Sequence, residues 1–77
     1  MTDKMQSVID IINDIRDDKD EAPLTEITEA TSLRDDAGLD SLDLAALTAR
    51  LDAKFGVDIF ADGIVGTVGE VMEKLGK

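Results

Sequence analysis

The 77-residue sequence contains no cysteine, histidine, tryptophan or tyrosine. Without cysteine there is no disulfide bond, no thiolate metal site and no cysteine nucleophile. Without histidine the chain lacks the commonest general base and the usual ligand of zinc, copper and iron. Two phenylalanines are the only aromatic residues, too few for the stacking platforms that bind single-stranded nucleic acid. These absences argue against an enzyme and against a nucleic-acid-binding protein.

Positive charge is also scarce, since eight Lys and Arg residues stand against eighteen Asp and Glu, giving a net charge of −10. An acidic surface repels phosphate backbones and anionic lipid headgroups, attracts proteins with basic patches, and favours a soluble monomer. No stretch is long and apolar enough to cross a membrane, and the start MTDKMQS has no apolar signal core. We therefore expect a cytoplasmic monomer whose partners are proteins.

Apolar residues recur at steps of three and four in three segments, which is the spacing of amphipathic helices. The predicted helices span about residues 2–16, 40–55 and 67–75. Thr67 and Glu70 have the spacing of a capping box at the start of the last helix. No segment alternates as a β-strand would.

The segments between these helices differ in length. The first, residues 17–40, is long for a chain of this size, and Leu33 is among the apolar residues that we expect to anchor it. The last, residues 60–66, contains glycine and predicts one short turn. We therefore predict a single all-α domain over residues 1–77. It is a small helical bundle of three main helices plus a short third helix or turn, with a long loop between helices 1 and 2.

The many carboxylates raise calcium binding as a candidate function. The best alignment to an EF-hand loop starts at Asp58, but it puts Phe60 at position three and Gly69 at position twelve, where a bidentate Glu is required. A carboxylate pair acting as general acid and base needs a cleft, for which a bundle of this size has little room. We predict no metal site and no catalytic residues.

The segment 38–42 (GLDSL) places Ser41 at the start of the second helix, after a glycine turn. A phosphate on its hydroxyl would lie near the free N–H groups and the positive dipole of the helix N-terminus. Asp40 and Asp43 would form an acidic rim for a basic partner. Asp and Ser are also ordinary helix-capping residues, so the local residues leave both interpretations open.

The wider pattern resembles the acyl carrier proteins of fatty-acid and polyketide synthesis. It consists of a helix, a long loop, Gly-x-Asp-Ser-Leu at a helix start, a Leu-rich stripe ending in Phe-Gly-Val-Asp-Ile, a weak turn, and a final Thr-Val-Gly-Glu-Val helix. The resemblance covers nearly the whole chain. It implies that Ser41 receives 4′-phosphopantetheine from coenzyme A, with Asp40 helping the transferase to orient the site, and that the thiol of this arm carries acyl groups as thioesters.

The resemblance also implies the partners, which are a phosphopantetheinyl transferase and the enzymes that load and process acyl groups in fatty-acid, polyketide or other specialised lipid and secondary-metabolite synthesis. The second helix would present the partner-binding residues, namely Leu42, Asp43, Ala46, Ala49 and Arg50. Core residues that would also part to admit an acyl chain are Leu47, Leu51, Phe55, Ile59 and Val68.

The second helix departs from the family's usual pattern. Typical fatty-acid carriers keep several Glu residues along it, whereas this chain has Ala46, Arg50 and Ala53 where acidic or neutral residues are usual, and Lys54 adds positive charge. The third-helix region is short and rich in glycine, which argues against a large acyl pocket. Both departures suggest a specialised free-standing carrier with its own partner enzymes.

Two alternatives stay open at this point. Peptidyl and aminoacyl carriers usually place Gly-Gly-x-Ser at the site, so Asp40 favours an acyl carrier, but some free-standing aminoacyl carriers also use Asp-Ser-Leu. The other alternative is an unmodified acidic interaction module that binds a basic partner through the second helix. In that case the Ser41 hydroxyl would serve only as a helix cap.

Overall fold

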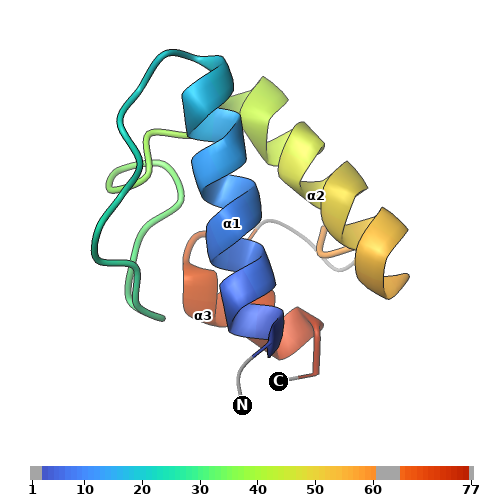
Figure 1. Cartoon of the computed structure of the whole chain (residues 1–77). Helices are drawn as coiled ribbons and strands as arrows, with labels where there is room; N and C mark the ends of the chain where they lie inside the picture. Colours follow the sequence, from blue (N-terminus) through green and yellow to red (C-terminus); the bar gives the residue numbers. More distant parts are fainter. Residues whose placement is uncertain (1–2, 61–64, 77) are drawn as a thin grey trace.

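The computed structural model describes residues 3–60 and 65–76, which form three helices and no strand (Figure 1). The helices are α1 (Asp3–Asp18), α2 (Ser41–Phe55) and α3 (Val68–Lys74). The predicted all-α fold is confirmed. The short turn expected within residues 60–66 falls largely on residues 61–64, which lie outside the described part of the chain.

The first helix runs to Asp18, beyond its predicted end near residue 16. The charged residues that follow Ile15 do not break a helix, and the chain leaves it at Asp20, which adopts a left-handed backbone conformation with φ of 60°. The backbone N–H of Glu21 then donates to the carbonyl of Arg16 at 2.9 Å. The turn rather than the change in composition therefore ends α1.

The predicted boundaries of the other two helices are confirmed. Gly56 ends α2 in the left-handed conformation, with φ of 71°. Thr67 caps α3, and its side chain and that of Glu70 each accept a hydrogen bond from the other residue's backbone N–H.

The hydrophobic core lies where the three helices and the long loop meet. The apolar stripe predicted for each helix faces this core. Buried core residues are Val8, Ile12 and Ile15 of α1, Leu44, Leu47 and Leu51 of α2, Val68, Val71 and Met72 of α3, and Leu33, Ala37 and Leu39 of the loop.

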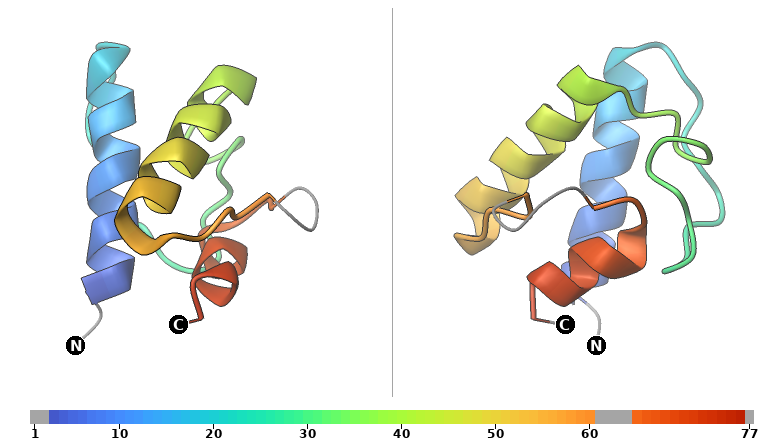
Figure 2. Two further views of the ribbon diagram at one scale, coloured as in Figure 1. Left: turned by 90° about the vertical axis from the view of Figure 1, so that its right-hand side faces the viewer. Right: turned by 180° about the vertical axis from the view of Figure 1, so that it is seen from behind.

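The loop of residues 19–40 runs along α1 to the level of α3 and returns to the start of α2 (Figures 1 and 2). Ser32 and Thr67 form an isolated antiparallel bridge, in which the Leu33 N–H donates to the Gly66 carbonyl at 2.9 Å. Leu33 is fully buried, so the loop is anchored as the sequence predicts. This anchoring fixes the start of the loop segment that leads from Leu33 to Ser41.

Helix α1 packs against both α2 and α3, and α3 lies beside its first turns (Figure 2). The Lys4 ammonium donates to the Leu75 carbonyl at 2.8 Å and ties the two ends of the fold together. Among the described residues no helix combines the length and the apolar character needed to span a membrane.

Candidate functional site

Ser41 is the first residue of α2, and its side chain is exposed. Asp40 is the cap of this helix, because its carboxylate accepts from the Asp43 N–H at 2.9 Å while the Asp43 carboxylate accepts from the Asp40 N–H at 3.1 Å. Asp40 rather than Ser41 is therefore the cap of α2. Within the described part of the chain no hydrogen bond engages the Ser41 hydroxyl, which leaves its oxygen available for reaction.

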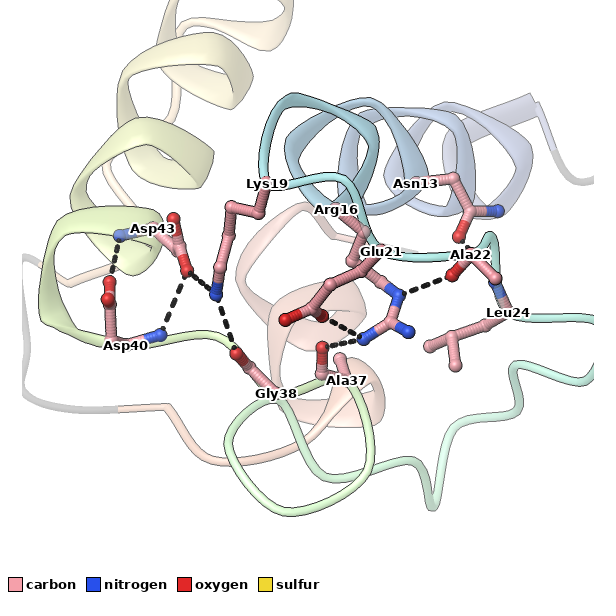
Figure 3. A network of polar contacts seen from close by, with 10 residues as sticks. All are labelled: Asn13, Arg16, Lys19, Glu21, Ala22, Leu24, Ala37, Gly38, Asp40 and Asp43. Carbon is pink, nitrogen blue, oxygen red and sulfur yellow. Dashed lines mark hydrogen bonds and ion pairs between the residues drawn. The ribbon is translucent and has the colours of Figure 1, made fainter.

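Lys19, just beyond the end of α1, joins that helix to the start of α2 (Figure 3). Its ammonium lies 2.7 Å from the Asp43 carboxylate and donates to the Gly38 carbonyl at 3.0 Å. The hydrogen bond to Asp43 raises the pKa of Lys19. Burial by itself would raise the pKa of Asp43, but the hydrogen bonds from Lys19 and from the Asp40 backbone hold that pKa below its ordinary value. Both groups are therefore charged near neutral pH.

Two further polar residues of α1 hold the long loop against the helix (Figure 3). The Arg16 guanidinium donates to the carbonyls of Ala22 and Ala37 and pairs with the Glu21 carboxylate at 3.0 Å. The Asn13 side chain accepts from the N–H of Leu24 at 2.9 Å. Asn13 and Arg16 of α1 and Lys19 just after it follow one another at steps of three along the chain. The segment that delivers Ser41 is thus fixed from the α1 side.

A groove of about 280 Å³ lies beside Ser41. It is lined by Arg34, Ser41, Leu44, Ala45 and Phe60. Its lining is mainly apolar, and Arg34 and Ser41 are the polar residues among those that line it. Across residues 3–60 and 65–76 no cluster of three or more Asp and Glu residues is arranged to hold a metal ion. The site therefore combines one free hydroxyl, one cation and an apolar channel.

Comparison with known proteins shows which family uses such an arrangement. Residues 6–75 match the family described as the phosphopantetheine attachment site. The chain belongs to this family. An acyl carrier protein of Saccharopolyspora erythraea is 43% identical over 53 residues, which are 66% of this chain and 56% of that relative. The matched region thus spans little more than half the length of the curated relative. Both matches confirm the resemblance to acyl carrier proteins.

The group that this family attaches covalently is 4′-phosphopantetheine, and the residues around Ser41 fit it. A phosphodiester on the Ser41 oxygen would lie at the N-terminus of a 15-residue helix, where the first N–H groups lack intrahelical acceptors. The slender pantetheine chain carries methyl and methylene groups between its hydroxyl and its two amides, and these apolar groups suit a groove floored by Leu44, Ala45 and Phe60. The group would supply the thiol that a chain without cysteine lacks.

The five residues predicted to bind partners on α2 lie in different environments. Leu42 is 81% exposed and Ala49 is also exposed. Ala46 is half-buried and packs against the core. Asp43 is engaged by Lys19, and Arg50 pairs with α1 carboxylates at 3.4 Å and 4.0 Å. The structure thus leaves Leu42, next to Ser41, exposed and directs the Asp43 carboxylate toward Lys19.

The five residues predicted as core and acyl pocket are not among the residues that line the groove. Leu47, Leu51, Ile59 and Val68 are fully buried, and Phe55 packs against them half-buried. Their role in admitting an acyl chain stays a prediction.

Two charged residues that lie near the site were not predicted from the sequence. Lys19 stands in the acidic run that follows α1, and Arg34 stands just before two aspartates. A cation within a run of acidic residues predicts an ion pair, because it has many possible carboxylate partners. Which partner it takes depends on the path of the loop.

Proposed function

We propose that residues 1–77 form one carrier domain in which Ser41 bears 4′-phosphopantetheine and the thiol of the arm carries acyl groups as thioesters. In the attachment step the Ser41 oxygen forms a bond to the phosphorus next to the pantetheine arm, the pyrophosphate bond of coenzyme A breaks, and adenosine 3′,5′-bisphosphate leaves. The hydroxyl proton passes to a base of the transferase or to solvent. The single observation that carries the proposal is the exposed, unbonded Ser41 hydroxyl at the edge of the groove.

The surrounding residues prepare this hydroxyl without taking part in chemistry. The Asp40 carboxylate satisfies the helix start, so the serine oxygen need not do so. Lys19 neutralises the charge of Asp43, which would otherwise repel an incoming phosphate. The chain supplies the tether and the recognition surface, and partner enzymes act on the acyl group.

The partners proposed for this surface are a phosphopantetheinyl transferase and enzymes that load and process acyl groups. Leu42 offers an exposed apolar contact next to Ser41, and Ala49 continues the exposed face of α2. The net charge of −10 favours enzymes with basic patches. Synthesis of fatty acids, polyketides or other specialised lipids and secondary metabolites is the setting that we propose.

The test is intact-mass measurement after incubation with coenzyme A and a broad-specificity phosphopantetheinyl transferase. We expect the wild type to gain one phosphopantetheine and Ser41→Ala to gain none. Ser7→Ala, a matched change at a serine of α1, should gain as much as the wild type. Absence of any gain with several transferases would overturn the proposal and favour the unmodified acidic interaction module.

Loss of fold cannot explain a failure of the Ser41→Ala variant, and urea unfolding checks this. Because Asp40 provides the cap, Ser41→Ala should change the free energy of unfolding by less than about 0.5 kcal/mol. Asp40→Ala should cost about 1 kcal/mol, as the loss of a cap does. The loaded acid, acyl or aminoacyl, would then be identified from the mass of the thioester formed with candidate loading enzymes.

A further inference from the structure

Arg34 lines the same groove as Ser41 and is exposed. Two other cations that hold the segment before Ser41 are engaged within the chain, Arg16 by Glu21 and Lys19 by Asp43. In contrast, no hydrogen bond or ion pair joins the Arg34 side chain to another residue of the described ranges. Among residues 3–60 and 65–76, Arg34 is thus a cation without a partner, and it lines the groove beside Ser41.

The backbone that carries Arg34 is fixed on both sides. The Ala37 N–H donates to the Ser32 carbonyl at 2.9 Å, and the Leu39 N–H donates to the Leu33 carbonyl at 2.9 Å. Leu33 and Ala37 are fully buried. The turn that presents Arg34 is therefore held in place before any ligand binds, which lowers the ordering cost of an interaction made by its side chain.

Three of the carboxylates that flank Arg34 and Ser41 along the chain have partners, whereas the Asp35 carboxylate has none among the described residues. The Asp36 carboxylate accepts from the Ser32 N–H at 2.8 Å, the Asp40 carboxylate caps α2, and the Asp43 carboxylate pairs with Lys19. A phosphodiester on Ser41 would add one more negative charge to a strongly acidic chain. Arg34 is the cation in the groove placed to offset it.

We propose that Arg34 is a positioning residue for the prosthetic arm. Its guanidinium pairs with the phosphodiester on Ser41 and directs the arm into the groove over Leu44, Ala45 and Phe60. A guanidinium presents two parallel donors to phosphate oxygens, which a lysine does not. This inference rests on the proposed attachment at Ser41.

The experiment compares the unmodified and modified forms of the wild type, Arg34→Ala, Arg34→Lys and Lys54→Ala. Lys54 is an exposed cation in the last turn of α2, so its replacement removes the same charge away from the groove. Intact mass first establishes complete modification of each protein. The readouts are the amide shifts of Ala45 and Phe60, the phosphorus-31 shift of the arm, and the Tm of each form.

We expect modification to shift the Ala45 and Phe60 amides in the wild type and in Lys54→Ala. In Arg34→Ala most of this shift should be lost, and the Tm difference between modified and unmodified forms should change by roughly 1–8 °C relative to the wild type. Arg34→Lys should restore part of the effect. The unmodified Arg34→Ala variant should have the same Tm as the unmodified wild type.

Equal amide, phosphorus and Tm responses in the wild type and Arg34→Ala would overturn the role of Arg34 while the mass gain upholds attachment. An equal loss in Lys54→Ala would also overturn it, because the effect would then be one of net charge. No mass gain on the wild type would overturn the proposed function itself, and the inference with it.

Discussion

At the scale of single residues, the contact between Lys19 and Asp43 links the end of α1 to the start of α2. Asp43 also accepts from the backbone of Asp40, so one carboxylate joins the helix cap to the neighbouring helix. A capping box at a helix start is usual. The ion pair between this capping box and Lys19, which directly follows α1, fixes the position of Ser41 relative to α1.

This contact predicts a defined dependence of stability on pH. The pKa of Asp43 is lowered in the folded chain from its ordinary value of 3.8, so the folded form binds fewer protons. Its contribution is therefore present above pH 3.8 and is lost as the pH falls through the lowered folded value. Lys19, whose pKa is raised from 10.5, contributes fully below that pH and loses its contribution only as the pH rises through the raised value.

We expect Asp43→Asn, which keeps an oxygen for the Asp40 N–H, to be less stable than the wild type by a constant margin near neutral pH. The margin should shrink below pH 3.8. Urea unfolding across this range measures it, with Asp52→Asn as the matched change on an exposed face of α2. A margin for Asp43→Asn that persists unchanged in acid would contradict the role of the ion pair.

At the scale of elements, α3 is held by the long loop at its first turn. The Gly69 N–H donates to the Glu29 carbonyl at 2.8 Å, and the Val68 N–H donates to the Thr31 carbonyl at 3.0 Å. The loop thus supplies acceptors for donors that the helix start leaves free. This close approach requires glycine, because a Cβ at Gly69 would lie 2.9 Å from the Glu29 carbonyl oxygen.

Gly69→Ala should therefore destabilise the protein although alanine is the better helix former. The propensity gain is about 1 kcal/mol, whereas overpacking against a backbone costs about 1–3 kcal/mol. Gly66→Ala is the control, since its Cβ would meet only the Glu70 side chain, at 3.4 Å. Thermal unfolding of the two variants measures the difference, and a Tm for Gly69→Ala above that of the wild type would contradict the contact.

At the scale of the whole molecule, a net charge of −10 is confined to a radius of gyration of 11.2 Å. Few cations are present, and two of them, Arg16 and Lys19, make short internal contacts with Glu21, Asp43 and the loop carbonyls. The remaining carboxylates repel one another across distances comparable with the Debye length at low salt. This long-range repulsion opposes folding, while the short ion pairs are screened less.

We therefore expect the Tm to rise as NaCl is increased from about 10 mM to about 500 mM, because the Debye length falls from about 30 Å to a few ångströms. Near pH 4.1, the sequence pI, the net charge vanishes and the rise should disappear. Differential scanning calorimetry at neutral pH and near pH 4.1 measures the change of Tm with salt. A Tm that falls with salt at neutral pH would show that attractive pairs outweigh the repulsion.

Much of this fold follows from local chemistry. The sequence predicts the helix periodicity, the left-handed Gly56 and the Thr67–Glu70 capping box, because each depends on residues only a few positions apart. The end of α1 was predicted too early, because it depends on the turn at Asp20. Asp43, whose role in partner binding stays a prediction, also pairs with Lys19, and the sequence does not predict this contact because the two residues are 24 positions apart.

The three helices, the position of Ser41 at a helix start and the family of the chain follow from short-range spacing and residue types, and the amino-acid sequence is enough to predict them. The choice of Asp40 over Ser41 as the cap of α2 depends on the backbone path into the helix, and both residue types are compatible with a cap. The pairing of Lys19 with Asp43 and the groove that Arg34 and Phe60 line beside Ser41 depend on the fold, because they bring together segments whose distance in space is set by the packing of the long loop and not by their distance along the chain.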